Sequence, residues 1–323
     1  MLDPVFQTAR KFLFQYLPQT RLVRSQSLQK SQWQNVYLKL ESEMPTGSFK
    51  VRGAIYALHA NEQRLATREV AASSTGNHGA AVAYAAKLLG WRARIFLPEK
   101  NNPTKRNNIA RLGAVIEERG AIDLAGAFEA ASEYARKAGA YFLNDATDRD
   151  LPAGPGTIAV EMLEQQPDID VIYVPMGDTA LIRGVAGAAK QISKSVKIVG
   201  VQSARAPSYF LSWKEGRAIE TDSCDTIADG LATRTPVAAN VRAIRELVDD
   251  VVLVSEEEML QAIGRLLIDE HLVAEPAGAA STAAYLKTQD RNRGSVAVLV
   301  TGANPTTRVL RQAIAAYEGD PIP

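Results

Sequence analysis

Short apolar runs alternate with helical patterns along this chain of 323 residues, and that alternation constrains the fold more than any other feature. Strand-like runs occupy residues 36–40, 70–72, 93–97, 115–117, 141–143, 171–174, 196–201, 251–254 and 296–300. Most are followed by stretches with helical character, at residues 50–60, 80–89, 104–112, 124–137, 156–165, 181–192, 255–270 and 306–317. Strands that crossover helices bury on both faces read as continuous apolar runs. The sequence therefore predicts an α/β fold of mostly parallel sheets flanked by helices.

Composition places the chain among ordinary globular proteins. Hydrophobic residues make up 46% and charged residues 23%, and the net charge is +1, so no global field favours nucleic acid or an anionic membrane. No run reaches the roughly 20 apolar residues of a membrane helix, and charged residues interrupt the first segment as they would not in a secretory signal. The single cysteine, Cys224, excludes an intrachain disulfide and is typical of a cytoplasmic protein. The three histidines lack zinc-like spacing, so we expect no metal site of that kind.

Lys50 is the most informative single residue, because it begins the predicted helix 50–60 after the strand 36–40. A lysine in the first turn of a helix points its cation at the positive end of the helix dipole, which disfavours the ammonium form. A lysine that must act as a neutral amine and condense with a carbonyl group gains from such a position. An arbitrary lysine is a solvated surface residue. The rest of the chain is therefore needed to distinguish a surface lysine from a reactive one.

Three further strand–helix junctions carry polar chemistry, and ligands collect at such junctions in parallel α/β sheets. Residues 73–79 combine hydroxyls, an amide, an imidazole and two glycines, which suits an anion such as a carboxylate, although helix capping alone would explain the hydroxyls. Residues 174–181 could hold a phosphate on free N–H groups, but they include Asp178, and an ordinary turn is an equal alternative. Thr301 ends a predicted central strand, where it could offer its hydroxyl to a ring nitrogen or pack by its methyl group.

The segment Gly154-Pro155-Gly156, with Ala159, fits a dinucleotide-binding pattern. A true fingerprint follows a strand immediately and opens a βαβ unit, whereas the polar, turn-like residues 147–150 precede this one. We therefore reject a nicotinamide cofactor.

Five segments occur together and in one order, at residues 48–54, 76–79, 226–232, 275–279 and 301–304, and Ser48-Phe49-Lys50 with Gly76-Asn77-His78-Gly79 is the most specific pair. With these segments, the chain resembles the threonine dehydratase and serine racemase family of pyridoxal phosphate enzymes, in the tryptophan-synthase-β-like group of fold type II. The resemblance implies two lobes, each with a mostly parallel sheet flanked by helices, and a cofactor cleft between them. Residues 1–62 and 150–323 would form a large cofactor-binding domain, and residues 70–142 a small mobile domain.

The resemblance also implies roles for individual residues. Lys50 would bind pyridoxal 5'-phosphate covalently, Phe49 would pack against the ring, and Asn77 would hydrogen-bond its phenolic oxygen. Thr301 would face the ring nitrogen, with Glu275 near the far side of the ring. The cofactor phosphate would lie on the loop formed by Gly177, Asp178, Thr179, Ala180 and Leu181. The carboxylate of a small amino-acid substrate would be bound by Ser74, Thr75, Asn77 and His78, and Thr75 is also a catalytic candidate.

The chain departs from the family pattern at three places. The phosphate loop of the family is normally a run of glycines, so Asp178 must turn away or be neutralised. Racemases of the family carry a serine where this chain has Thr75. Acidic side chains that bind a divalent cation in racemases are replaced here by Gln202 and Ser208, so we predict no metal at that place.

A hydroxyl beside the ring nitrogen makes the cofactor a weaker electron sink, which favours rapid loss of a β-substituent, and Lys50 would take the α-proton as general base. The sequence therefore predicts an ammonia-lyase that converts a β-hydroxy amino acid such as threonine or serine to a 2-oxo acid and ammonia. We expect a cytoplasmic homo-oligomer, a dimer or a tetramer. Three alternatives stay open: an amino-acid racemase, a lyase for a bulkier 3-hydroxy or 3-amino substrate, and a binding protein that keeps the fold without catalysis.

Overall fold

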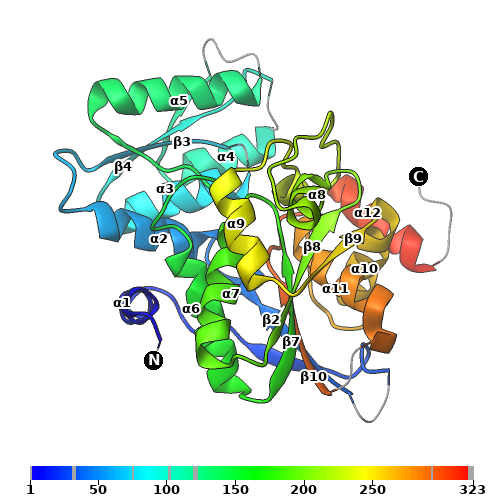
Figure 1. The fold of residues 1–323 in the computed structure, drawn as a ribbon. Helices are drawn as coiled ribbons and strands as arrows, with labels where there is room; N and C mark the ends of the chain where they lie inside the picture. Colours follow the sequence, from blue (N-terminus) through cyan, green and yellow to red (C-terminus); the bar gives the residue numbers. More distant parts are fainter. Residues whose placement is uncertain are drawn as a thin grey trace.

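The computed structural model describes residues 2–30, 34–74, 76–100, 103–118, 123–291 and 294–318 of the chain. Its strands form two separate sheets, each with helices packed on it (Figure 1), so the α/β fold with two lobes that the sequence predicted is confirmed. Within the described residues, no helix combines the length and the apolar composition that crossing a bilayer requires.

The larger sheet has six strands, which come from both the early and the late parts of the chain. The strand order is β1-β2-β10-β7-β8-β9, with bounds of Leu22–Ser25 (β1), Gln34–Leu40 (β2), Ile169–Pro175 (β7), Lys197–Ser203 (β8), Asp250–Val254 (β9) and Gly294–Val300 (β10). β1 is antiparallel to β2, and every other neighbouring pair is parallel. Val36 of β2 lies beside Val296 of β10, so an early strand belongs to the sheet that the second half of the chain mostly builds.

The smaller sheet has four parallel strands in the order β5-β4-β3-β6. Their bounds are Glu69–Ser73 (β3), Arg92–Phe96 (β4), Val115–Glu117 (β5) and Tyr141–Phe142 (β6). The chain thus leaves the larger sheet after β2, builds the smaller sheet, and returns to the larger one at β7. In Figure 1 the smaller sheet lies above the larger one.

Helices connect the strands and cover both sheets. Their bounds are Pro4–Leu13 (α1), Lys50–Asn61 (α2), Asn77–Leu89 (α3), Pro103–Arg111 (α4), Leu124–Ala138 (α5), Ala153–Gln165 (α6), Ala180–Ile192 (α7), Ser208–Glu215 (α8), Ala238–Leu247 (α9), Glu256–Ile268 (α10), Pro276–Thr288 (α11) and Thr307–Glu318 (α12). Short 3₁₀ turns lie at Glu41–Glu43 (η1), Asp229–Leu231 (η2) and Gln289–Arg291 (η3). Sequence patterns did not indicate β1, α8, α9 or α11.

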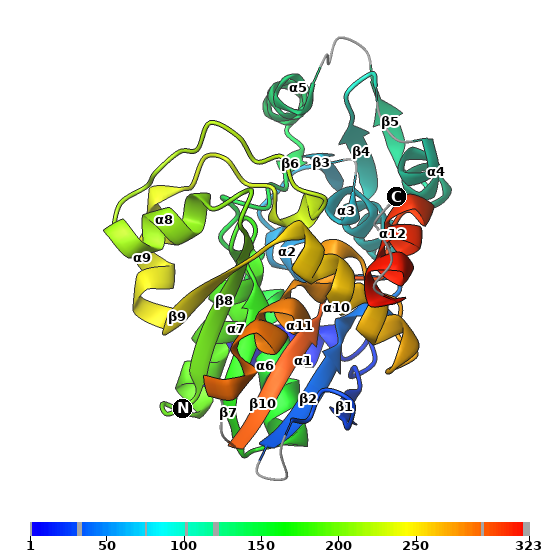
Figure 2. The same cartoon turned by 90° about the vertical axis from the view of Figure 1, so that its right-hand side faces the viewer.

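Both faces of the larger sheet are buried, which explains why its strands read as continuous apolar runs. Along β10, Val296 and Val298 belong to a core shared with α10 and α11, whereas Ala297 and Leu299 belong to a core shared with α6 and α7. In Figure 2, α10 and α11 lie in front of the sheet. Every residue of α11 from Pro276 to Tyr285 is buried, so this helix has no polar face that periodicity could detect.

The glycine pattern that imitates a dinucleotide fingerprint lies at the start of α6. A Cβ on Gly154 would lie 2.3 Å from the backbone oxygen of Arg52, so the glycine allows α6 to pack closely against α2. The nearest preceding strand, β6, ends at Phe142, and no strand leads directly into this turn. Close helix packing therefore accounts for the pattern.

Candidate active site

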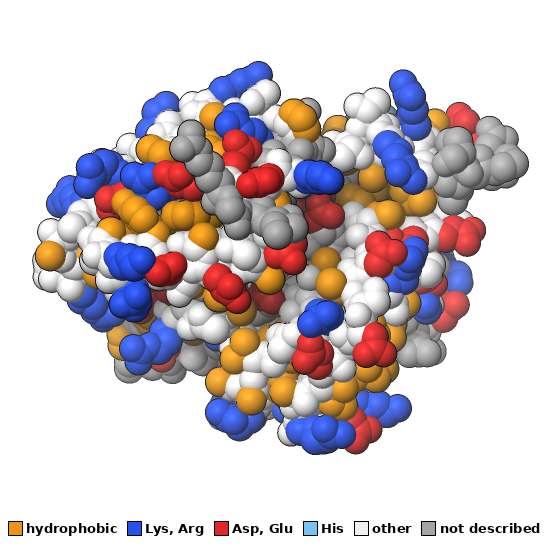
Figure 3. All heavy atoms as spheres, turned by 90° about the horizontal axis from the view of Figure 1, so that it is seen from above, with side chains coloured by type: hydrophobic (Ala, Val, Ile, Leu, Met, Phe, Trp, Pro, Cys, Tyr) orange, Lys and Arg blue, Asp and Glu red, His pale blue; other side chains and the backbone are white. Residues whose placement is uncertain are grey.

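A cavity of about 910 Å³ lies between the lobes and is lined by residues of both. Its walls include the segments that follow β3, β6, β7 and β10. Ligands of α/β sheets usually bind at the carboxyl ends of the strands, and the volume falls in the range of small-molecule sites. Seen from above, the surface is hollowed between the lobes, and acidic side chains are visible inside the hollow (Figure 3). The cavity is therefore the candidate active site.

Lys50 lines this cavity from the first turn of α2. The segment before Lys50 is attached to the end of β10, because the Phe49 N–H donates to the Thr301 oxygen at 3.1 Å and Ser48 forms an isolated bridge with Gly302. The Lys50 Nζ lies 5.5 Å from the centre of the Phe49 ring. The structure therefore brings Phe49 and Lys50 to one wall of the cavity together with Thr301, which is distant from them in sequence.

The Lys50 ammonium group forms an ion pair with Asp145, a residue that the sequence analysis missed. The Oδ1 atom of Asp145 lies 2.7 Å from the Nδ1 atom of His78. Burial acts to raise the pKa of Asp145, but the His78 ring and the Lys50 ammonium outweigh it and hold that pKa well below its usual range. Asp145 follows the end of β6, so its place at a strand end was the available signal.

His78 lies in the first turn of α3, and its ring is already engaged. The Nε2 atom lies 3.0 Å from the Leu143 oxygen, to which it must donate because a carbonyl oxygen only accepts, and Nδ1 faces Asp145. Ser74 is on the same wall, where its Oγ accepts a hydrogen bond from the Gly76 N–H at 3.2 Å. The proposed contact of His78 and Ser74 with a substrate carboxylate stays a prediction. Thr75, which was predicted at this wall, lies outside the described residues.

Asn77 is held between two residues of the larger lobe. Its Nδ2 donates to Glu275 Oε1 at 2.5 Å, and its Oδ1 accepts from Asn304 Nδ2 at 2.8 Å. Burial raises the pKa of Glu275 to about 7, although the hydrogen bond from Asn77 acts in the opposite direction. The structure thus brings Asn77 and Glu275 into direct contact. The family resemblance implied that both residues lie near one cofactor ring.

The loop between β7 and α7 forms the wall at which a phosphate was predicted. A Cβ on Gly177 would lie 2.1 Å from the backbone oxygen of Gly230, so a larger residue does not fit there. Thr179, the N-cap residue of α7, has a φ of 70°, which is rare for a β-branched residue. Ala180 and Leu181 begin α7, and N–H groups in the first turn of a helix lack acceptors within it. The loop can therefore bind an anion through its backbone.

Asp178 lies in the same loop with its side chain mostly buried. The Thr233 hydroxyl donates to Asp178 Oδ1 at 3.0 Å. Burial raises the pKa of Asp178, and the charge of Asp145 raises it further, whereas the Lys50 ammonium acts against both. The Asp178 carboxyl group is therefore within electrostatic reach of Lys50 and Asp145.

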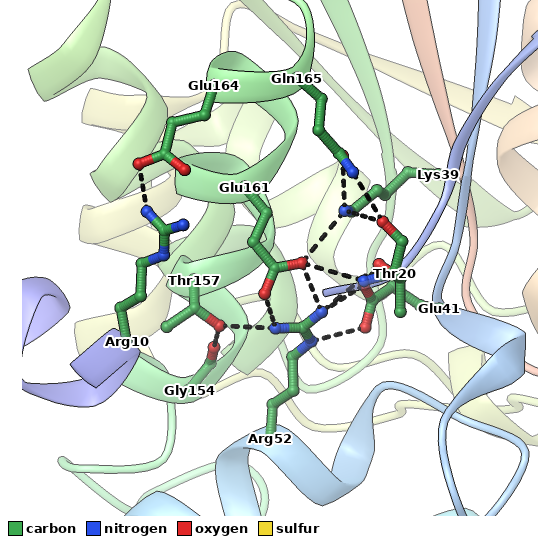
Figure 4. Close-up of polar contacts among 10 residues, drawn as sticks. All are labelled: Arg10, Thr20, Lys39, Glu41, Arg52, Gly154, Thr157, Glu161, Glu164 and Gln165. Carbon is green, nitrogen blue, oxygen red and sulfur yellow. Dashed lines mark hydrogen bonds and ion pairs between the residues drawn. The ribbon is translucent and has the colours of Figure 1, made fainter. Parts of the chain in front are cut away.

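A buried network of charges fixes the helix that carries Lys50 (Figure 4). The Arg52 guanidinium donates to Glu41 at 2.8 and 2.9 Å and to Glu161 at 2.6 and 2.9 Å. The Lys39 ammonium donates to Glu161 at 3.1 Å. All four side chains are buried, and two positive charges balance two negative ones. The network ties the first turn of α2 to β2, η1 and α6, and so fixes the backbone of Lys50.

The two positions at which no metal was predicted have other partners. Gln202 Oε1 accepts from the Phe210 N–H at 2.9 Å, and Ser208 Oγ donates to the Thr233 oxygen at 2.6 Å. Over the described part of the chain, no group of His, Cys, Asp and Glu side chains could hold a metal ion.

Comparisons with known proteins agree with this geometry. The family described as "Pyridoxal-phosphate dependent enzyme" matches residues 13–302. The L-threonine ammonia-lyase of Thermotoga maritima is 36% identical over 307 residues, which cover 95% of this chain and 76% of that protein. The structure of maize serine racemase matches with a TM-score of 0.89 at 29% identity, over 98% of this chain and 97% of that one. The structure of the processed form of threonine deaminase isoform 2 from Solanum lycopersicum matches with a TM-score of 0.90 at 27% identity, over 98% and 89% of the two chains.

The family resemblance and the cofactor that the sequence predicted are confirmed by these matches. The family match covers both lobes and the segments that line the cavity. The chain belongs to the pyridoxal-phosphate dependent enzymes.

Proposed function

We propose that the protein is an ammonia-lyase that converts a β-hydroxy amino acid such as threonine or serine to a 2-oxo acid and ammonia. The observation that carries this proposal is the position of Lys50, which enters a cavity bounded by strand ends and has the Asp145 carboxylate against its ammonium group. The similarity to the L-threonine ammonia-lyase of Thermotoga maritima, over 95% of this chain, supports the same type of reaction.

The residues around the cavity fit pyridoxal 5'-phosphate. Lys50 supplies the amine for the aldehyde, and Phe49 lies beside it. The start of α7 supplies N–H groups for the phosphate, and Gly177 allows the loop to pack tightly enough. Asp178 is the one unfavourable residue in this loop, and its pKa is raised by burial but lowered by the Lys50 charge and by the hydrogen bond from Thr233.

When bound, the cofactor would withdraw electrons from the α-carbon of an amino acid, so that the α-hydrogen becomes acidic and a β-hydroxyl group, on gaining a proton, can leave as water; addition of water to the released unsaturated amine then gives the 2-oxo acid and ammonia. Lys50, once the substrate amine has taken its place, would accept the α-proton at Nζ. Asp145 would then stabilise the ammonium group that forms, since the two side chains are already in contact. Ser74, Asn77 and His78, together with the predicted Thr75, would orient the substrate carboxylate.

Amino-acid racemisation is the second candidate function, because the similarity to maize serine racemase extends over 97% of that chain. Racemisation requires a second acid–base group on the opposite side of the α-carbon, and Thr75 is the residue predicted to lie there. The products separate the two reactions, since a racemase yields the mirror-image amino acid and a lyase yields a 2-oxo acid with ammonia.

The test incubates the purified enzyme, loaded with pyridoxal phosphate, with both enantiomers of threonine and of serine. We expect 2-oxo acid and ammonia in equal amounts from at least one of them, and none from Lys50→Ala treated in the same way. Mirror-image product without 2-oxo acid would identify a racemase. Absence of all products, together with absence of the visible absorption of a lysine-bound cofactor, would identify a binding protein.

We also infer a cytoplasmic homo-oligomer, a dimer or a tetramer. The free thiol of Cys224 is consistent with a reducing compartment. Light scattering coupled to gel filtration gives the mass of the assembly, and a monomer at micromolar concentration would contradict the inference.

A further inference from the structure

The cavity is lined by the acidic residues Asp145, Asp178, Asp229 and Glu275. Two of them have partners other than Lys50, because Asp229 is paired with Lys105 and Glu275 accepts a hydrogen bond from Asn77. The other two, Asp145 and Asp178, interact electrostatically with each other and with Lys50, which acts on the pKa of Glu275 only as the weakest of several causes. We call Asp145 and Asp178 the acidic pair.

Lys50 acts electrostatically on both members of the acidic pair, and so does the His78 ring. Lys50 forms its ion pair with Asp145, and Asp178 accepts a hydrogen bond from the neutral Thr233 hydroxyl instead. Burial raises the pKa of Asp178, and the charge of Asp145 raises it further. Two carboxyl groups in such a place repel each other unless a cation compensates them.

Catalysis removes the Lys50 ammonium group from contact with Asp145. A lysine that is covalently bound to an aldehyde, or that acts as a neutral amine base, no longer offers an ammonium group to Asp145. A phosphate on the neighbouring loop would add negative charge beside Asp178. His78 remains 2.7 Å from Asp145 Oδ1, but this buried oxygen receives no well-directed hydrogen bond from the described residues. Two mostly buried carboxyl groups that have lost one of their neighbouring cations are less well compensated, so the loaded site favours a second cation.

We propose that the acidic pair selects a substrate with a second positive charge. This substrate is an α-amino acid that has a hydroxyl or amino group on its β-carbon and an ammonium group in its side chain. This inference rests on the proposed function and names its substrate class. The methyl group of threonine offers the acidic pair no partner, and a side-chain carboxylate would be repelled. A charge-assisted hydrogen bond to a mostly buried carboxylate corresponds to about tenfold to a hundredfold in affinity, and we expect the preference to lie in that range.

The test uses two ligands that differ by one ammonium group and cannot undergo β-elimination, because neither has a leaving group on the β-carbon. L-2,4-Diaminobutanoate and L-2-aminobutanoate are titrated into the cofactor-loaded enzyme by calorimetry. The readout is the dissociation constant of L-2-aminobutanoate divided by that of L-2,4-diaminobutanoate, which we call the ratio. We expect the wild type to bind the diamino acid at least about tenfold more tightly. Equal affinities, or tighter binding of the neutral ligand, would overturn the proposal.

Variants assign the preference to the acidic pair. We expect the ratio to fall toward one in Asp178→Asn and in Asp145→Asn, and to stay at the wild-type value in Asp229→Asn, a cavity carboxylate that is already paired with Lys105. An unchanged ratio in Asp178→Asn would remove Asp178 from the proposal, even where Asp145→Asn fails to fold or to retain the cofactor. An equal fall in all three would mean that overall cavity charge, not the acidic pair, sets the preference.

The two proposals fail separately. A wild type that releases 2-oxo acid from threonine or serine but shows a ratio near one overturns the charge selection alone. A wild type that prefers the diamino acid but releases no 2-oxo acid from any β-hydroxy amino acid overturns the proposed lyase function and leaves charge recognition standing.

Discussion

Replacing Arg52 with methionine tests the buried charge network behind Lys50. Methionine fills much of the same space but carries no charge, so among the described residues Lys39 remains as the cationic neighbour of Glu41 and Glu161. Arg52 also donates to the Thr157 hydroxyl at 3.0 Å, and that contact is lost as well. Deleting one partner of a buried ion pair costs about 3–5 kcal/mol, because the remaining charge stays buried without compensation.

This free-energy cost corresponds to a measurable decrease in the melting temperature. Unfolding entropy is about 2.1 cal/mol/K per residue, which gives roughly 0.7 kcal/mol/K for a chain of 323 residues. We therefore expect Arg52→Met to lower the melting temperature by about 4–7 °C. Differential scanning calorimetry without added cofactor measures the change, so that ligand binding does not contribute.

Arg10→Met is the matched control, because Arg10 also pairs with a glutamate of α6 (Figure 4). The Arg10 and Glu164 side chains are 28% and 51% exposed, and exposed pairs contribute about 0–1 kcal/mol. The control variant is expected to melt within about 1–2 °C of the wild type. Equal shifts in the two variants, or an Arg52→Met protein as stable as the wild type, would refute the assigned role of the buried network.

The cavity residues lead to three further expectations. Lys50→Ala is expected to keep the fold and to lose both the visible absorption of bound cofactor and nearly all release of 2-oxo acid, and retained turnover would remove Lys50 from its proposed role. Asp178→Gly is expected to bind pyridoxal phosphate as tightly as the wild type or more tightly in equilibrium dialysis, because a carboxyl group is removed from the phosphate loop; a large loss of affinity would contradict this. Burial raises the pKa of Glu275 from 4.5 to about 7, so its contribution to folding is fully present below pH 4.5 and is lost as the pH rises through about 7. Without cofactor, the melting temperature of Glu275→Gln should therefore rise relative to that of the wild type as the pH increases from about 5 to about 8. A constant difference in melting temperature across that range would argue against the raised pKa.

The strands of the larger sheet were accessible to sequence reasoning because burial on both faces leaves a local signature. The run predicted at 296–300 is β10, Gly294–Val300, and the run at 171–174 is β7, Ile169–Pro175. The same burial conceals α11, since a helix with no exposed face has no amphipathic period. Local pattern therefore predicted the strands of the larger sheet better than this buried helix, which packs on that sheet.

The site was only partly predictable, because its motifs are contiguous in sequence, whereas its ion pairs join residues that are distant in sequence. Lys50 and the Gly76-Asn77-His78-Gly79 segment stand out as strand–helix junctions, and the structure places Lys50, Asn77 and His78 in one cavity. Asp145 belongs to no motif, and its importance comes from Lys50, which is 95 residues away in sequence. The positive φ of Thr179 was also hidden, since a threonine there gives no sign of a left-handed backbone.

The chain passes between the two sheets twice, and each passage carries one partner of the Lys50–Asp145 ion pair. α2 leads from β2 to β3, and the segment after β6 leads back through α6 to β7. In a hinged body the points on the axis are displaced least. If the lobes swing apart about these two passages, the amine of Lys50 that is proposed to react stays nearly stationary while Ser74 and Asn77 move outward, so substrates and products could exchange without realignment of the lysine.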